Sequence, residues 1–207
     1  SHFYDIFRYQ ILDTNSYIEE IWAYGYWAID RCARIIKEGA SFKEVTKGDL
    51  TEVEGCIAQA YAIKGLCSFY LTNMFGLPYS EANKTTLGIV NVTEPVPAYS
   101  QVSRVSVEQN YSLILDDITK AKEYYAKEGV ENVGKQYMNT AAVAALEARV
   151  KLYMKNYEGA ITAAQEAITL SGGTIVSTKE DYKNMYTTLA VSTEDIFFIA
   201  KAEDDYL

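Results

Sequence analysis

Five segments of this chain repeat their apolar residues every three or four positions, and this pattern constrains the fold more than any other feature. The spacing places the apolar residues on one face of an α-helix, where they can pack against neighbouring helices. Only one short run near the end of the chain is typical of a strand. We therefore predict an all-α fold, with helices over about 16–38, 49–75, 106–128, 139–154 and 157–171.

The ends of these segments carry residues that begin and end helices. Ser16 with Glu19, and Ser106 with Gln109, have the spacing of a capping box, in which each side chain bonds to the backbone amide of the other residue. Glycines follow four of the five segments, and glycine commonly ends a helix. We therefore expect the first helix to begin at Ser16 and to stop at Gly39.

The last two predicted helices form a tight hairpin that resembles a tetratricopeptide repeat (TPR), a unit of two antiparallel helices. Ala148 lies where the repeat has a small residue, which lets the two helices approach closely. Tyr157, Ala160 and Ala167 match the second helix, whereas Ala164 stands where an aromatic residue is usual. Because one such unit cannot bury its own apolar face, we expect it to stack on the other helices, with the first two as a second, degenerate unit.

A long segment, 77–105, separates the second and third predicted helices and has no helical period. It contains all three prolines of the chain. A connection of this length without regular structure is uncommon in a compact domain and is often functional. Beyond the hairpin we expect only a short helix over about 181–186 and a short strand over 196–199, so that β-structure is minor at most.

The composition argues against several classes of protein. The 207 residues carry a net charge of −9 with 19 Lys and Arg, whereas binding of nucleic acid needs a basic face. The chain has no run of about 18 apolar residues, the length with which a helix crosses a membrane. Cys32, Cys56 and Cys67 lie inside helical patterns and are odd in number, which favours buried thiols over a disulfide framework.

The sequence contains no recognisable catalytic motif. Its single histidine, His2, is the second residue, so catalytic schemes built on histidine have little to use. It lacks a Cys-x-x-Cys pair, a His-Glu-x-x-His zinc motif and a glycine-rich phosphate loop. The acidic clusters 116–117 and 203–205 are typical of solvated surfaces. We therefore expect no enzyme activity, no cofactor and no metal site.

Several short motifs follow one another in a specific order. They are Trp22, Tyr26 and Ile29 followed by 32–36, then Gln59 to Gly65 with Phe75-Gly76-Leu77-Pro78, then Arg104 to Ala121, the helical hairpin, and Glu194 to Phe198. This ordered set resembles the SusD/RagB family of bacterial outer-membrane proteins. The chain departs from the family pattern at Ala33, where the family has asparagine, and at Lys64-Gly65, where it has arginine and alanine.

The resemblance implies a function at the bacterial cell surface. A SusD-like protein is an outer-membrane lipoprotein that binds a glycan or other nutrient without cleaving it and delivers it to a SusC-like TonB-dependent transporter. Residues 1–207 would form its TPR-containing helical domain, truncated at both ends, because family members are longer and carry a signal and a lipidated cysteine. The alternative is a TPR scaffold for protein–protein interaction, but generic scaffolds lack the motifs around Gly76 and Arg104.

The candidate ligand residues lie mostly outside the apolar faces of the helices. Sugar rings stack on flat aromatic side chains, while their hydroxyls bond to polar groups. Trp27 shares a helical stripe with charged residues, so we expect it either at the surface or packed against a further part of a longer protein. The resemblance implies that the region before the first helix contributes to a glycan site. The candidate carbohydrate-binding residues are therefore Tyr9, Asp13, Asn15, Trp27, Tyr79 and Tyr99.

Overall fold

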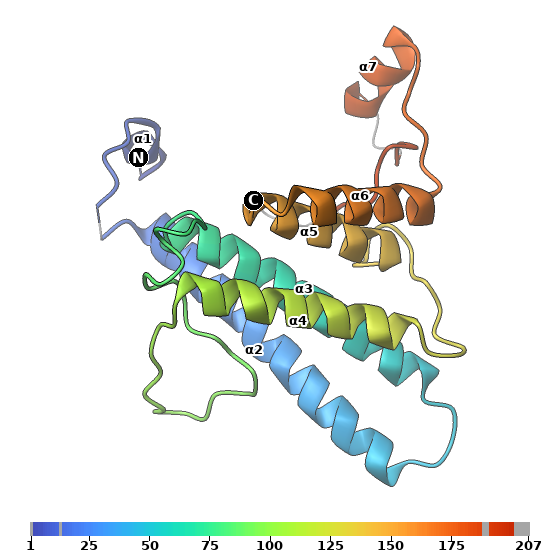
Figure 1. Cartoon of the computed structure of the whole chain (residues 1–207), viewed down its shortest axis with the longest axis horizontal. Coiled ribbons are helices and arrows are strands. Elements are labelled where there is room, and N and C mark those ends of the chain that lie inside the picture. Colours follow the sequence, from blue (N-terminus) through green and yellow to red (C-terminus); the bar gives the residue numbers. More distant parts are fainter. Residues whose placement is uncertain (1, 13, 188–190, 201–207) are drawn as a thin grey trace.

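The structure of the protein is a computed structural model that describes residues 2–12, 14–187 and 191–200. In these residues α-helix is the only regular element, and it makes up more than half of them (Figure 1). The predicted all-α class is therefore confirmed. The helices are α1 (His2–Phe7), α2 (Ser16–Val45), α3 (Thr51–Phe75), α4 (Val107–Tyr125), α5 (Thr140–Tyr153), α6 (Tyr157–Ser171) and α7 (Lys179–Thr187).

Helices α2 to α6 pack against one another in the order in which they follow along the chain. α2 and α3 form a long antiparallel hairpin, α4 lies along α3, and the shorter hairpin α5–α6 packs on α4 and α3 (Figure 1). α1 and α7 lie apart from this stack. Residues 76–106, here called the covering segment, leave the stack at the end of α3 and return at the start of α4. Among the described helices, none has the length and apolar character needed to cross a membrane.

The core has two parts that meet along α3. The larger part lies between α3, α4 and α5 and centres on Phe69, Tyr111 and Ile114, each of which is at most 2% exposed. The smaller part lies between α2, α3 and the covering segment, so the irregular segment contributes to the core of the fold. Its buried residues are Ile29, Ala33, Leu71, Ile89 and Val92.

The structure confirms several predicted helix ends and corrects one cap. Ser106 and Gln109 form both halves of a capping box at the start of α4, as predicted. α2 begins at Ser16, but its capping residue is Asn15, whose side-chain oxygen accepts hydrogen bonds from two backbone amides of the first turn. The predicted capping box of Ser16 and Glu19 is therefore wrong, because the preceding residue already satisfies those amides.

The predicted stop of the first helix at Gly39 is also wrong, because α2 continues to Val45. A Cβ atom at Gly39 would lie 2.8 Å from Cδ1 of Ile57, which is fully buried in α3. Gly25 lies in the same relation to Leu71, at 2.9 Å. These glycines therefore allow α2 and α3 to approach closely, and neither ends the helix.

Helices α5 and α6 lie antiparallel and side by side, as the hairpin pattern predicts (Figure 1). The turn between them falls at the predicted residues, with Lys155 at a φ of 61° and Asn156 capping α6. α6 ends at Gly172, whose φ of 58° is in the left-handed region that glycine adopts without strain. Ala148 is half-buried, and the buried face of α6 consists of alanines. These are Ala160, Ala163 and Ala167.

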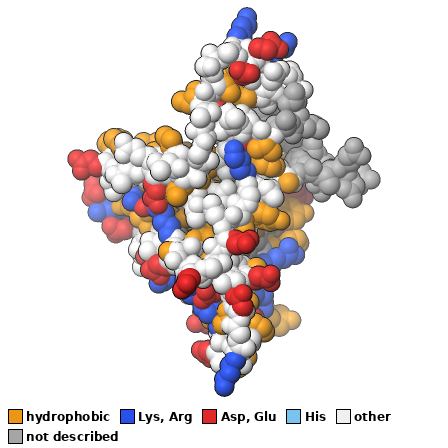
Figure 2. Space-filling view, turned by 90° about the vertical axis from the view of Figure 1, so that its right-hand side faces the viewer, with side chains coloured by type: hydrophobic (Ala, Val, Ile, Leu, Met, Phe, Trp, Pro, Cys, Tyr) orange, Lys and Arg blue, Asp and Glu red, His pale blue; other side chains and the backbone are white. Residues whose placement is uncertain are grey.

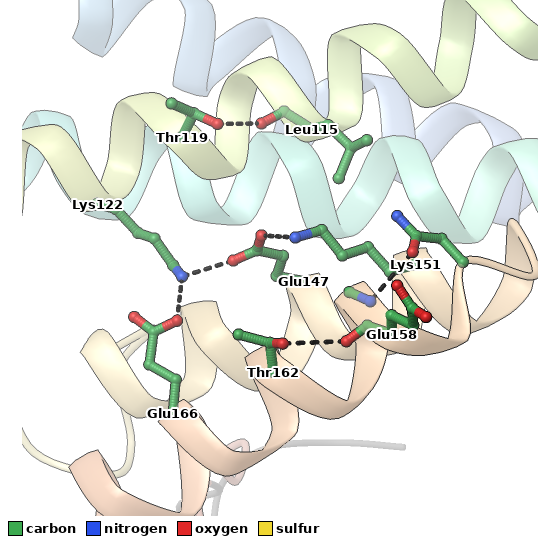
Figure 3. A network of polar contacts seen from close by, with 10 residues as sticks. Leu115, Thr119, Lys122, Glu147, Lys151, Glu158, Thr162 and Glu166 are labelled. Atoms are coloured by element: carbon green, nitrogen blue, oxygen red, sulfur yellow. Dashed lines mark hydrogen bonds and ion pairs between the residues drawn. The ribbon is translucent and has the colours of Figure 1, made fainter.

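Ion pairs join α4 to this hairpin at the edge of the stack (Figure 3). Nζ of Lys122 lies 2.5 Å from a carboxylate oxygen of Glu147 and 2.6 Å from one of Glu166. Glu147 also pairs with Lys151 at 2.5 Å. Burial opposes the charge of Glu147, but its hydrogen bonds to the two lysines outweigh burial and lower its pKa. The carboxylate therefore stays ionised at neutral pH and connects α4 to α5.

The predicted strand over 196–199 does not form. Phe198 N donates a backbone hydrogen bond to Lys135 O at 3.1 Å, but one such bond is too little for a ladder. Two of its apolar side chains pack against the larger part of the core instead. Within the residues described, β-structure amounts to one isolated bridge, so the expectation of minor β-structure is confirmed. The short helix expected near 181–186 is α7.

Candidate functional site

A groove with a volume of about 340 Å³ lies between α2 and the covering segment; we call it the Trp27 groove. Trp27 is 59% exposed and packs edge-on against Tyr24, with the ring centroids 5.2 Å apart. An indole with a free face beside a groove is suited to stacking on a flat ligand. The groove is lined by Trp22, Tyr26, Trp27 and Asp30 from α2 and by Val90, Val92, Val96 and Val102 from the covering segment.

The aromatic wall of the groove is continuous with the core. The ring centroid of Trp22 lies 4.8 Å from that of Tyr26 and 4.9 Å from that of Phe75, the last residue of α3. Tilted and edge-on contacts at this distance are favourable arrangements for aromatic pairs. The wall is therefore fixed from below, as a binding surface needs to be if it is to hold its shape.

Two side chains bond to the backbone of the covering segment as a neighbouring strand would. The Tyr26 hydroxyl accepts a hydrogen bond from Val90 N at 2.8 Å and donates one to Val90 O at 3.0 Å. In the same way Asn110 of α4 accepts from Ile89 N at 2.8 Å and donates to Ile89 O at 3.1 Å. Burial raises the pKa of Tyr26 to about 12, more than the hydrogen bond with Val90 lowers it, so the hydroxyl keeps the proton that it donates.

Arg104 fastens both ends of the covering segment. Its guanidinium donates to the carbonyl oxygens of Gly88, of Leu87 at 3.3 Å and of Phe75 at 2.7 Å. Because Phe75 is the last residue of α3, the guanidinium also satisfies a free carbonyl at the end of that helix. Leu87 and Ser106 form the isolated β-bridge nearby. Arg104, prominent in the sequence motif, therefore has a structural role.

A buried ion pair lies behind the covering segment. Lys64 of α3 and Asp117 of α4 are joined by an Nζ–Oδ1 distance of 2.8 Å, and both side chains are 3% exposed. Lys64 Nζ also donates to the carbonyl oxygen of Val92 at 3.1 Å. Asp117 Oδ2 has no hydrogen-bond partner among the described residues. Burial raises the pKa of Asp117 to about 6, more than the attraction of Lys64 lowers it.

Asp30 supplies a charged group at the groove. Its carboxylate accepts a hydrogen bond from Arg34 Nε at 2.7 Å, one turn further along α2. Both side chains are accessible to solvent, so the pair places hydrogen-bonding groups beside Trp27 without burying them. A ligand that carries many hydroxyls needs such groups next to the aromatic face that it covers.

Of the five predicted ligand residues that the structure describes, Trp27 is the one that lines this groove. Tyr99 belongs to the covering segment, where it is fully exposed with a φ of 64°. Tyr79 packs against Tyr111 in the larger part of the core, with ring centroids 4.9 Å apart. Asn15 is 5% exposed and caps α2, so its side-chain oxygen is already engaged.

The other two predicted residues lie in the segment before Asn15. Tyr9 is 93% exposed at a φ of 56°, and Asp13 lies outside the described residues. Trp22 and Tyr26 also line the groove but are not among the predicted ligand residues, because aromatic side chains of a helix most often belong to the core. The sequence did contain one indication of the other wall of the groove. Val90 and Val92 are two positions apart, and this spacing puts side chains on one face of an extended chain.

Charged side chains are mixed over the surface. On the face that Figure 2 shows, Lys and Arg lie among Asp and Glu and form no basic stripe of the kind that nucleic acid binding requires. In the part of the chain that the structure describes, no three His, Cys, Asp or Glu side chains gather in a way that could hold a metal ion. The Trp27 groove is therefore the leading candidate site.

Known proteins of similar sequence and structure give this groove a context. A SusD-like family model, described as starch-binding associating with outer membrane, matches residues 3–152. No curated protein matches the sequence. A SusD superfamily protein from Bacteroides thetaiotaomicron VPI-5482 is 28% identical, with a TM-score of 0.74 over 85% of this chain and 37% of that one.

Two further solved structures are similar. A putative sugar binding protein from Bacteroides vulgatus ATCC 8482 is 28% identical, with a TM-score of 0.75 over 88% of this chain and 41% of that one. A SusD superfamily protein from Bacteroides fragilis, 22% identical, has the same fold, with a TM-score of 0.77 over 96% of this chain and 44% of that one. The chain thus spans about two-fifths of these proteins. Because the family match covers more than half of the chain, this chain belongs to the SusD-like family.

Proposed function

We propose that this chain is the helical, TPR-containing part of a protein that binds carbohydrate at the bacterial cell surface, and that the Trp27 groove holds the sugar. The observation that carries the proposal is the exposed indole of Trp27 beside an aromatic-walled groove, in a chain of a family described as starch-binding. The 28% identity to a putative sugar binding protein supports the same ligand class.

The chemistry of the groove fits a neutral oligosaccharide. The apolar face of a pyranose ring stacks on indole, and its hydroxyls can bond to the carboxylate of Asp30 and the guanidinium of Arg34. The valines opposite offer an apolar surface to the rest of the ring. Tyr99, fully exposed on the covering segment, is available for further contact with a longer chain of sugars.

We propose binding without cleavage. Hydrolysis of a glycosidic bond commonly uses two carboxylates on opposite sides of that bond. Among the residues that line the groove, Asp30 is the only carboxylate, and it pairs with Arg34. The groove therefore supplies a stacking surface and one charged pair, which suffices for recognition.

We further propose that the protein is an outer-membrane lipoprotein that delivers its glycan to a SusC-like TonB-dependent transporter. The family description, which associates starch binding with the outer membrane, supports this location. Affinity purification of the tagged protein from outer-membrane extracts should recover a transporter of that class. Recovery of the protein without such a transporter, in extracts where complexes of neighbouring systems survive, would contradict this part of the proposal.

Titration with oligosaccharides tests the groove directly. Trp22 and Trp27 are the only tryptophans in the chain and both line the groove, so their indole N–H signals in NMR spectra report binding there. Trp27→Ala should weaken binding about tenfold, the effect of losing one aromatic contact. Tyr157→Ala is the matched control, because Tyr157 has the same 59% exposure on α6. Equal affinity for Trp27→Ala and wild type would refute the placement.

The alternative function, a scaffold for protein partners, has one observation in its favour. The outer side of α6 exposes Ile161 at 60% and Ile168 at 62%. Apolar side chains at a spacing of seven lie on the same face of a helix, as in a partner-binding stripe. If a protein partner binds there, Ile161→Glu should abolish its binding while sugar binding at the Trp27 groove is retained.

A further inference from the structure

The covering segment forms one wall of the Trp27 groove, and the buried ion pair lies directly behind that wall. We propose that Lys64 is a positioning residue of the groove: its ammonium ties the Val92 carbonyl of the wall to Asp117 in the core, and losing this tie loosens the wall. This inference rests on the proposed function only in taking the groove as the binding site. It assigns to the pair a role beyond holding α3 against α4.

The ammonium has three donors, and the structure accounts for two of them. One bonds to Asp117 Oδ1 at 2.8 Å and another to Val92 O at 3.1 Å. Val92 is 6% exposed, lines the groove and belongs to the smaller part of the core. A shift of the ammonium would therefore move a residue that faces the ligand. An arginine at this position would present a planar fork that can engage both carboxylate oxygens. The lysine keeps a donor for Val92, and Asp117 Oδ2 has no partner within the described part of the chain.

The surroundings isolate Asp117 as the group that changes charge. Cys32 faces the pair from α2 and Tyr61 from α3, and Asp116 is its neighbour on α4. Burial raises the pKa of the Cys32 thiol to about 12 and raises that of Tyr61, so both stay neutral in weak acid. The pKa of Asp117, raised to about 6 by burial, falls in the range that can be titrated without unfolding most proteins. Protonation removes the counter-charge of Lys64 and leaves a buried ammonium uncompensated.

Replacing both charges tests the tie without leaving an unpaired charge. The variant Lys64→Met with Asp117→Leu should fold, because apolar groups of similar volume commonly substitute for a buried pair. In this variant the wall should be looser, so that acrylamide quenches the fluorescence of Trp22 and Trp27 more strongly. The amide of Val90, bonded to Tyr26, should exchange its hydrogen about tenfold faster, as expected for loss of one hydrogen bond to a charged group. The control, Lys122→Met with Glu147→Leu, removes the partly exposed ion pair between α4 and α5, leaves Glu166 and Lys151 accessible to solvent, and should change neither readout.

A pH titration of tryptophan fluorescence is the second test of the proposal. The wild type should show a transition with a midpoint near pH 6, and the double variant should show none. His2→Gln should keep the transition, which excludes the single histidine as its source. If the double variant does not fold, Asp117→Asn takes its place. At every pH, its tryptophan fluorescence should equal that of the wild type on the acid side of the transition. Wild-type quenching and Val90 exchange in the double variant, or in Asp117→Asn, would overturn the proposal. Because no sugar is used, this result is independent of whether the groove binds glycan.

Discussion

The two helical hairpins are both joined to α4 by ion pairs, but in different environments. Asp117 pairs with Lys64 of the α2–α3 hairpin, and both side chains are 3% exposed. Lys122 pairs with Glu166 of the α5–α6 hairpin, where the exposures are 30% and 42%. The distances, 2.8 and 2.6 Å, do not tell which ion pair contributes more to stability. The exposure of the side chains does, because breaking a pair that water cannot reach leaves an unsolvated charge.

The hairpins also differ in how their helices approach each other. α2 approaches α3 at Gly25 and Gly39, where bulky side chains of α3 fill the space above the glycines. α6 instead presents alanines to α5. In the α2–α3 hairpin, the helices therefore pack closely because glycines face large side chains. In the α5–α6 hairpin, they do so because the residues of α6 at the contact are small. The α2–α3 contact should be the less tolerant of enlargement, since no Cβ fits where the opposing side chain already lies.

The largest expected effect is at the buried pair. Lys64→Ala should lower the free energy of unfolding by about 3–5 kcal/mol at pH 8, because it leaves the Asp117 carboxylate buried without a counter-charge. Urea denaturation followed by circular dichroism measures this. A loss below about 1 kcal/mol, the range typical of surface pairs, would remove the contrast between the two hairpins.

The pH dependence of this effect has a defined sign. The pKa of Asp117 is raised by burial from 3.8 to about 6, so its contribution to stability is present below about pH 3.8 and is lost as the pH rises through 6. Lys64→Ala removes the group that lowers this pKa. In the variant, the contribution of Asp117 to stability therefore continues to fall above pH 6. The difference in unfolding free energy between wild type and variant should therefore be larger at pH 8 than at pH 5. A difference that grows in acid would contradict the argument.

A smaller effect is expected at the glycine contact. Gly25→Ala places a Cβ within 2.9 Å of two methyl groups of Leu71, which is 2% exposed. Overpacking of a core costs about 1–3 kcal/mol, which exceeds the gain of about 1 kcal/mol from replacing a helical glycine by alanine. Thermal unfolding measures the balance. Gly55→Ala in α3 is the control, because its nearest neighbour would be 3.8 Å away, and it should be stabilising.

Gly65→Ala should stabilise the protein by about 0.5–1 kcal/mol through helix propensity. The new Cβ would lie 3.5 Å from Cβ of Asp117 and 3.6 Å from the carbonyl oxygen of Ile114, which are ordinary contacts. Position 65 is where the family pattern has alanine. If the midpoint of urea unfolding falls in this variant, the space between α3 and α4 is tighter than these distances indicate.

The smallest effect is expected at the exposed pair. Glu166→Gln should lower the free energy of unfolding by about 0.2–1 kcal/mol, because Glu166 is 42% exposed and Lys122 keeps its bond to Glu147. This loss should disappear in about 1 M salt, where surface charges are screened within roughly 3 Å. The loss caused by Lys64→Ala should persist in the same salt, since ions do not reach the buried site.

Much of the helical frame is predictable from the sequence, because apolar periodicity and caps such as Ser106 with Gln109 act locally. Gly39 shows where this reasoning fails. A glycine after a helical pattern and a glycine at a close helix–helix contact are identical in sequence, and the distinction depends on Ile57, 18 positions away along the chain. The prediction of a strand over 196–199 was wrong for a related reason. A strand needs a second strand to pair with, and the sequence of this run does not indicate which segment that would be.

The candidate site is less predictable than the frame. Trp27 could be identified as a surface aromatic because it shares a stripe with charged residues. Tyr26 could not, because its ring lies in the core stripe and its function depends on one hydroxyl bonded to Val90, 64 positions away. Lys64 appeared only as a departure from a family pattern, and a buried lysine is identified by its neighbours in space rather than in sequence.

The side chains of Tyr26 and Asn110 have a consequence for the solution behaviour of the protein. Extended backbone with free N–H and C=O groups is a template onto which a second chain can add, and it is a common starting point for fibrils. At Ile89 and Val90 a phenol and an amide already occupy both groups of each residue. At these two residues, next to the candidate binding groove, the backbone is therefore not available as an edge to which another chain could add.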